Sequence, residues 1–168
     1  MILQLTPNTH PILHERVKPC SKDLDRPEMS RILKENMMHY EGVGLSANQI
    51  GISERVFIMM LNMETEETIT CFNPRIIKRY DDNVWCEEGC LSFPEHFAEI
   101  DRPDKLKIEY IDENNKKKIL STDGFNSRII QHELDHLNGI LFVDHLSRLK
   151  RDVIIRKMKK FKKEEKIV

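Results

Sequence analysis

The sequence predicts an α+β fold in which antiparallel β-sheets pack around a central helix, with one further helix near the N-terminus and another at the C-terminus. Two observations support this fold class. Short strand-like segments follow one another through short polar connections, which is typical of antiparallel sheets rather than of helix-linked parallel ones. Three other segments show helix signals. Because 168 residues are enough to bury one core, we expect a single domain over residues 1–168.

The composition is that of an ordinary globular protein, with 39% hydrophobic residues, 33% charged residues and a formal net charge of -1. Global charge therefore favours neither nucleic acid nor a membrane as a partner. The chain begins without the basic and apolar regions of a signal peptide, and it shows no apolar run of about 18 residues that could span a membrane. The four cysteines, which lack the spacing of a disulfide framework, are Cys20, Cys71, Cys86 and Cys90. We expect a cytoplasmic protein with reduced thiols.

The first helix is predicted to begin after Asp25 and to end near Glu41. Asp25 is a capping residue, Pro27 lies near the first helical position, and Glu28 follows the cap by three residues. Apolar side chains then recur at helical spacing, at Met29, Ile32, Leu33, Met37 and Tyr40. We interpret them as the face that packs on the core.

Residues 42–51 contain three glycines among small residues, so their backbone must closely approach another strand or a ligand. The glycine spacing does not match a dinucleotide-binding fingerprint, and no lysine stands where a phosphate-binding loop requires one. A nucleotide site is therefore disfavoured.

Four strands are predicted in two pairs. Residues 55–61 and 68–77 are joined by an acidic turn, and residues 105–112 and 116–122 are joined by Glu113-Asn114-Asn115. The second pair is expected to form an antiparallel hairpin because its connection is so short.

The central helix is predicted over residues 125–139, which contain Gln131-His132-Glu133-Leu134-Asp135-His136. On a helix, His132 and His136 project from the same face about 6 Å apart, where they can share one metal ion. Glu133 is rotated off that line, so it is better placed to act as a general base on a water bound to the ion.

A metal centre of this kind needs a third protein ligand. Phe142 occupies the position at which the extended metalloprotease motif has a third histidine, and the downstream Glu164 and Glu165 lie among lysines, as solvated charges do. Upstream, Cys90 lies in the glycine-hinged segment 87–95 and can supply a thiolate, leaving one position for water. The alternative for Cys90 is a small buried thiol without a ligand role.

Three segments together resemble the signature motifs of the peptide deformylases: residues 42–49, Glu88-Gly89-Cys90-Leu91-Ser92 and residues 131–136. Their order and approximate spacing are those of the family, and the resemblance covers nearly the whole chain. It implies a hydrolase in which a metal-bound water attacks the formyl group of N-formylmethionyl peptides on newly made polypeptides. It also implies one divalent ion, Fe2+, which zinc, nickel or cobalt replaces in isolated protein.

Carried over residue by residue, the resemblance implies a role for each chemical group. The implied metal ligands are Cys90, His132 and His136. Glu133 resembles the acid/base, and the Gln49 side chain with the backbone N–H of Leu91 resembles the pair of oxyanion donors. Glu88 and Arg102 are expected to pair and to support the cysteine segment.

The residues expected to contact the substrate include departures from the family pattern. Val43 and Gly44 have the small, extended character of an edge strand that can add a peptide through main-chain hydrogen bonds. Phe97 replaces a frequent arginine, and Phe125 and Arg128 occupy a helical turn where aliphatic residues are usual. Two interpretations of Arg128 are open. Its stem lines the pocket while its charge reaches water, or its charge faces the substrate and weakens turnover, which Arg128→Leu would partly restore.

Residues 147–163 show apolar side chains at roughly helical spacing among many basic ones, at Leu149, Val153, Ile154, Met158 and Phe161. A solvated surface helix is the ordinary interpretation. The resemblance implies an alternative, in which this helix contacts ribosomal RNA. Two other functions stay open for the chain: an amidase for a different N-acyl substrate, favoured by Phe97 and Arg128, and a catalytically weak ribosome-associated homologue.

Overall fold

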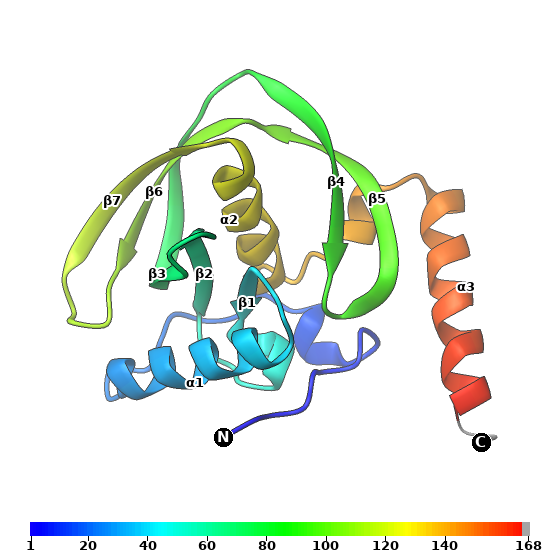
Figure 1. The fold of residues 1–168 in the computed structure, drawn as a ribbon, viewed down its shortest axis with the longest axis horizontal. Coiled ribbons are helices and arrows are strands. Elements are labelled where there is room, and N and C mark those ends of the chain that lie inside the picture. The colour runs from blue at the N-terminus through cyan, green and yellow to red at the C-terminus, as the bar shows by residue number, and fades with distance from the viewer. Residues whose placement is uncertain (166–168) are drawn as a thin grey trace.

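The computed structural model describes the backbone of residues 1–165 and the side chains of residues 1–160. Antiparallel sheets surround one central helix, which confirms the predicted α+β class (Figure 1). The helices are α1 (Arg26–His39), α2 (Gly124–Leu137) and α3 (Arg148–Glu165), with short 3₁₀ helices η1 (Pro11–Leu13), η2 (Ala47–Ile50) and η3 (Phe142–His145). The strands are β1 (Gly44–Ser46), β2 (Val56–Asn62), β3 (Glu67–Arg79), β4 (Asn83–Cys90), β5 (Phe93–Pro103), β6 (Lys105–Ile111) and β7 (Lys117–Asp123).

The strands form a five-stranded antiparallel sheet in the order β1-β2-β3-β6-β7 and a separate β4-β5 hairpin. The predicted pairings of β2 with β3 and of β6 with β7 are confirmed. The β4-β5 hairpin was not predicted. In the structure, residues 87–95 are the end of β4, a turn at Leu91 and Ser92, and the start of β5. These strands lack a clear sequence signal because glutamates and a glycine lower their β-propensity, and because the polar residues Glu88 and Arg102 are buried beside the apolar Ile100.

Helix α2 lies between the large sheet and the β4-β5 hairpin (Figure 1). One side of α2 presents Ile129, Ile130, Leu134 and Leu137 to a buried cluster that includes strand residues such as Phe57. Removing this apolar surface from water stabilises the helix in its central place. The opposite side of α2 is therefore held facing the hairpin.

Helix α1 begins as predicted, because the side chain of Asp25 accepts a hydrogen bond from the backbone N–H of Glu28 at 3.1 Å. It ends at His39, two residues before the expected position. Its buried apolar residues, Met29, Leu33 and Met37, pack in a second cluster with residues of β1, η2 and β2. This cluster fixes the glycine-rich segment against the large sheet.

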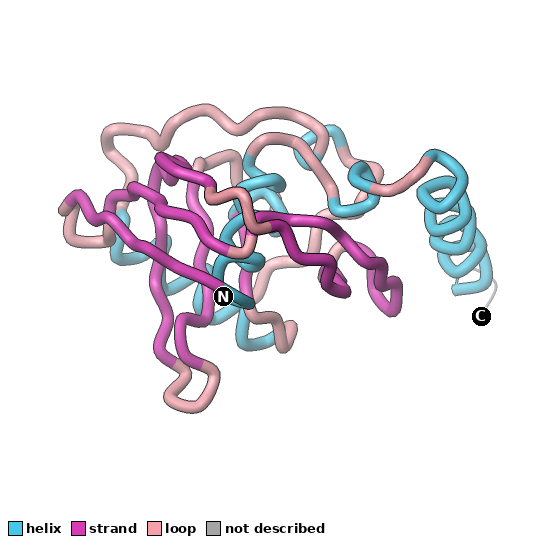
Figure 2. The backbone as a smooth tube through the Cα atoms, turned by 90° about the horizontal axis from the view of Figure 1, so that it is seen from above, coloured by secondary structure: helices cyan, strands magenta, loops and turns pink. Residues whose placement is uncertain are grey.

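Helix α3 stands at one side of the molecule in both views (Figures 1 and 2). Met158 is buried and Ile154 packs beside it on a third cluster, but Leu149 is 75% exposed. Leu149, one of the apolar side chains at helical spacing, therefore faces solvent, and Phe161 lies outside the side chains that the structure describes. Within the described residues, no helix is both long enough and apolar enough to cross a membrane.

Candidate metal centre

Cys90, His132 and His136 meet between the hairpin and α2. One donor atom from each lies within 4.8 Å of the other two, and Cys90 Sγ is 3.2 Å from His136 Nε2. The two histidines are one helical turn apart on α2, so they project from the same side of the helix, which is the side that faces the hairpin. Strand β4, which ends at Cys90, supplies the third donor. Among the described residues, these three side chains form the group that is suited to hold a metal ion.

The chemistry of these donors fits a metal ion. Burial by itself would raise the pKa of the Cys90 thiol, but the imidazoles of His136 and His132 hold that pKa well below its ordinary value. The two imidazoles therefore favour the thiolate, which is the form that binds metals. One thiolate and two imidazoles suit zinc or iron and leave a coordination position for water.

Glu133 lies beside this donor set and is buried, with 4% of its surface exposed. Burial raises the pKa of its carboxyl group above the ordinary value. Its Oε2 atom is buried without a hydrogen-bond partner among the described residues. Buried polar atoms rarely stay unpaired, so this oxygen suits exchange of a proton with a water molecule at the centre.

Gln49 approaches the same place from η2. Its Oε1 accepts hydrogen bonds from the backbone N–H and the hydroxyl of Ser46, both at 3.0 Å. Because a backbone N–H can only donate, these contacts fix which end of the amide is the oxygen. The Nε2 group then points towards Cys90 Sγ at 3.6 Å and Ser92 Oγ at 3.3 Å. Leu91 follows Cys90 in the turn between β4 and β5.

Ser46 was not predicted to contribute to this arrangement. Ser46 and Gln49 are three residues apart, which is the spacing of a capping box, and the backbone N–H of Ser46 donates to the Gln49 side chain as in that motif. That spacing is visible in the sequence and could have identified Ser46 as the residue that orients the Gln49 amide.

A buried network supports His132. Glu88 Oε1 lies 3.1 Å from His132 Nδ1, and the Arg102 guanidinium donates to both oxygens of Glu88 at 2.6 and 2.9 Å. Burial would raise the pKa of Glu88, but hydrogen bonds from His132 and Arg102 lower it below its ordinary range. Arg102 also donates to Asp135 at 2.8 Å. The predicted Glu88–Arg102 pairing is confirmed, and the Glu88 contact leaves His132 Nε2 free to face Cys90.

A cleft of about 870 Å³ opens from this centre to the surface. The residues expected to contact the substrate all line it: Val43, Gly44, Phe97, Phe125 and Arg128. Phe97 and Phe125 are 61% and 53% exposed, so apolar surface remains available there. Strand β1 is an edge of the large sheet, and an edge strand has main-chain groups free to pair with an extended peptide.

Arg128 is placed differently from the expectation that its charge reaches water. The residue is 7% exposed, and its guanidinium donates to Glu88 Oε2 at 2.6 Å. It also donates to the backbone carbonyls of Ile100 at 2.9 Å and Val84 at 2.7 Å. That expectation is wrong because a buried carboxylate and two carbonyls of the hairpin lie within reach of the side chain, which a single sequence cannot reveal.

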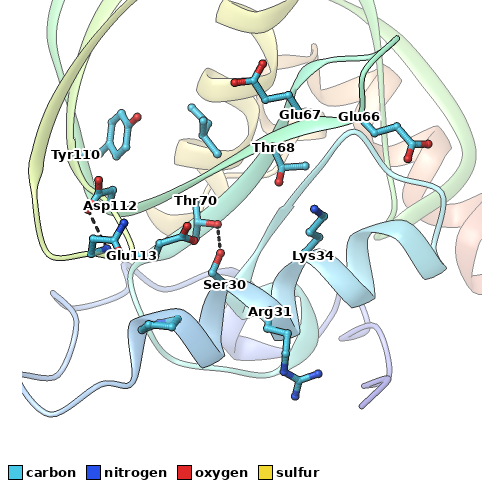
Figure 3. A pocket seen from close by; sticks show the side chains of 13 residues that line it. Ser30, Arg31, Lys34, Glu66, Glu67, Thr68, Thr70, Tyr110, Asp112 and Glu113 are labelled. Carbon is cyan, nitrogen blue, oxygen red and sulfur yellow. Dashed lines mark hydrogen bonds between the residues drawn. The ribbon is translucent and has the colours of Figure 1, made fainter.

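A second hollow, of about 720 Å³, lies between α1 and the turns that follow β2 and β6 (Figure 3). Charged groups of both signs line it, including Lys34, Glu66 and Glu113, and the hydroxyls of Ser30 and Thr70 are 2.6 Å apart (Figure 3). Its charged side chains are mostly exposed and mixed in sign, so we assign no ligand to it.

Comparisons with known proteins agree on one family. The profile of the family described as polypeptide deformylase matches residues 2–152. A peptide deformylase of Agrobacterium fabrum is 39% identical over 153 residues, which are 89% of this chain and 90% of that protein. A peptide deformylase from a Wolbachia of Brugia malayi is 44% identical over 146 residues, 81% of this chain and 82% of that protein. The crystal structure of peptide deformylase from Ehrlichia chaffeensis superposes with a TM-score of 0.92, at 30% identity and full coverage of both chains.

Proposed function

Because this chain belongs to the polypeptide deformylase family, whose members are metal-dependent hydrolases, we propose that it removes the formyl group from the N-terminal formylmethionine of newly made polypeptides. The observation that supports this most directly is the convergence of Cys90, His132 and His136 within 4.8 Å of one another. Glu133 and Gln49 lie at the same place, so donors for a metal, a proton acceptor and an amide N–H are present together.

Each group has a task in amide hydrolysis. A divalent ion held by Cys90, His132 and His136 would lower the pKa of a water molecule and polarise the formyl carbonyl. Glu133 accepts the proton of the attacking water and then donates it to the leaving amine, a task suited to a carboxyl group whose pKa is raised. The Gln49 Nε2 group and the Leu91 backbone N–H donate to the former carbonyl oxygen as negative charge develops on it.

The cleft supports an extended peptide substrate. We propose that the substrate backbone adds to the sheet edge at Gly44 of β1 and at Val43, which precedes that strand, and that Phe97 and Phe125 contact its side chains. We further propose Fe2+ as the native ion, because the resemblance implies it and the donor set accepts it. The proposed setting is the cytoplasm, with the basic helix α3 contacting the ribosome.

The direct test is formate release from a formyl-Met-Ala-Ser peptide by protein purified without oxygen and loaded with Fe2+. We expect turnover with this peptide and none with its acetyl-Met counterpart. Turnover of the acetylated peptide alone would support the amidase alternative. Protein that binds the metal but releases no product from either peptide would contradict the proposal and favour the catalytically weak homologue.

Gly44→Ala is expected to lower kcat/KM for formate release by about 10²-fold, the typical cost of displacing a catalytic group by about 1 Å. A Cβ at this position would lie 2.9 Å from Glu133 Oε1 and 2.9 Å from Ile129 Cγ2, so the carboxylate must move. The bound metal should stay, because the atoms nearest to this Cβ belong to Glu133 and Ile129 and not to a metal ligand. Formate release and metal content measured on the same sample check this, and wild-type kcat/KM in the variant would contradict it.

A further inference from the structure

Arg128 connects the two elements that supply the metal ligands. It lies on α2, one turn before His132, and its guanidinium contacts three groups of the hairpin: Glu88 Oε2 at 2.6 Å, Ile100 O at 2.9 Å and Val84 O at 2.7 Å. Val84 and Glu88 belong to β4, and Ile100 belongs to β5. A single side chain of the helix thus holds both strands of the hairpin that ends in the cysteine ligand.

The Glu88 carboxylate is fixed from both sides. Its Oε1 atom contacts His132 Nδ1 at 3.1 Å and Arg102 Nη2 at 2.9 Å, whereas its Oε2 atom contacts Arg102 Nε and Arg128 Nη1, both at 2.6 Å. Hydrogen bonds from two guanidinium groups leave the carboxylate little freedom to rotate. Because Arg128 anchors the oxygen that does not contact the histidine, it keeps the other oxygen directed at His132.

Removal of Arg128 does not leave an unpaired buried charge. Glu88 keeps its two contacts with Arg102, and Arg102 keeps its contact with Asp135 at 2.8 Å. A second link between the helix and the hairpin also remains, from Gln131 Nε2 to Pro103 O at 2.9 Å. A folded variant is therefore expected, in which the ligands are held less firmly.

We propose that Arg128 is a positioning residue of the metal centre, which tunes metal affinity by holding Glu88 against His132 and β4 against α2. The proposal rests on the metal centre of the proposed function but not on its substrate. Hydrogen-bond partners of metal ligands typically contribute about 10- to 100-fold to metal affinity, because they orient the ligand. These contacts predict that Arg128→Leu weakens the centre, in contrast to the sequence-based expectation that this change improves turnover.

The test compares Arg128→Met with the wild-type protein in the binding of Co2+, measured by competition with a chelating indicator. We expect the dissociation constant to rise about 10- to 100-fold, with altered visible absorption bands of the bound Co2+, which report the geometry of the thiolate and imidazole ligands. Arg128→Lys keeps the charge but lacks the planar fork that reaches three acceptors, so its affinity should lie between the two. Arg31→Met, which removes an exposed arginine of α1, should bind Co2+ as the wild-type protein does.

The outcomes separate positioning from other roles. Wild-type Co2+ affinity and spectrum in both folded Arg128 variants would overturn the proposal, and a raised KM with unchanged Co2+ binding would assign Arg128 to the substrate instead. If thermal unfolding shows that Arg128→Met is not folded, Arg128→Lys alone decides, by its Co2+ affinity and spectrum relative to Arg31→Met. Absence of formate release by the wild-type protein would refute the proposed function while leaving this comparison of Co2+ binding intact.

Discussion

Glu133→Gln is expected to reduce kcat for formate release by about 10²- to 10⁴-fold, the range typical of losing general acid–base catalysis. The amide has the shape of the carboxylate but cannot accept the proton of the attacking water. Glu133 is buried beside the three donors, and its Oε2 atom has no hydrogen-bond partner among the described residues, whereas the buried carboxylate of Glu88 is held by Arg102 and Arg128. Because Glu133 is not among the three donors, the metal should remain bound.

The measurement pairs steady-state formate release with metal content by mass spectrometry on the same protein sample. Glu99→Gln is the matched control, because it makes the same chemical change on an exposed position of β5. A Glu133→Gln variant that keeps full metal content and a rate near that of the control would show that another group moves the proton. Loss of metal together with activity would instead place Glu133 among the ligands.

Cys90→Ala is expected to abolish stoichiometric metal binding and to reduce formate release to background. The imidazoles of His132 and His136 remain, so a divalent ion would keep only two of its three protein ligands. The loss of affinity should exceed the 10- to 100-fold that typically follows removal of a ligand's hydrogen-bond partner, since a ligand itself is removed. A cysteine ligand binds as a thiolate, so Cys90 also supplies the negatively charged member of the donor set.

Cys86→Ala provides the control for this change. Cys86 lies four residues earlier on β4, is half-buried, and is outside the group of three donors. After dialysis against a weak chelator, the Cys86 variant should retain about one ion per chain, as the wild-type protein does, and the Cys90 variant should retain none. Equal metal content in the two variants would contradict the assignment of Cys90 as a ligand.

The sequence by itself determined the features that depend on short-range geometry. His132 and His136 share a face because four residues make about one helical turn, and Glu133 stands beside them for the same reason. The start of α1 at Asp25 and the hairpin of β6 and β7 were also predicted, because a cap and a short turn are local signals. The three motifs likewise identified the family without any coordinates.

Only the tertiary structure decided the contacts between segments far apart in the chain. Cys90 and His136 are 46 residues apart, and their 3.2 Å separation depends on how the β4-β5 hairpin packs against α2. From the sequence, the guanidinium of Arg128 could reach water, substrate or a buried carboxylate. In the structure it contacts the carboxylate of Glu88, which is 40 residues away in the chain. Local spacing sets the direction of a side chain on its own helix or strand, whereas its partner is set by the packing of separate elements, which no short segment encodes.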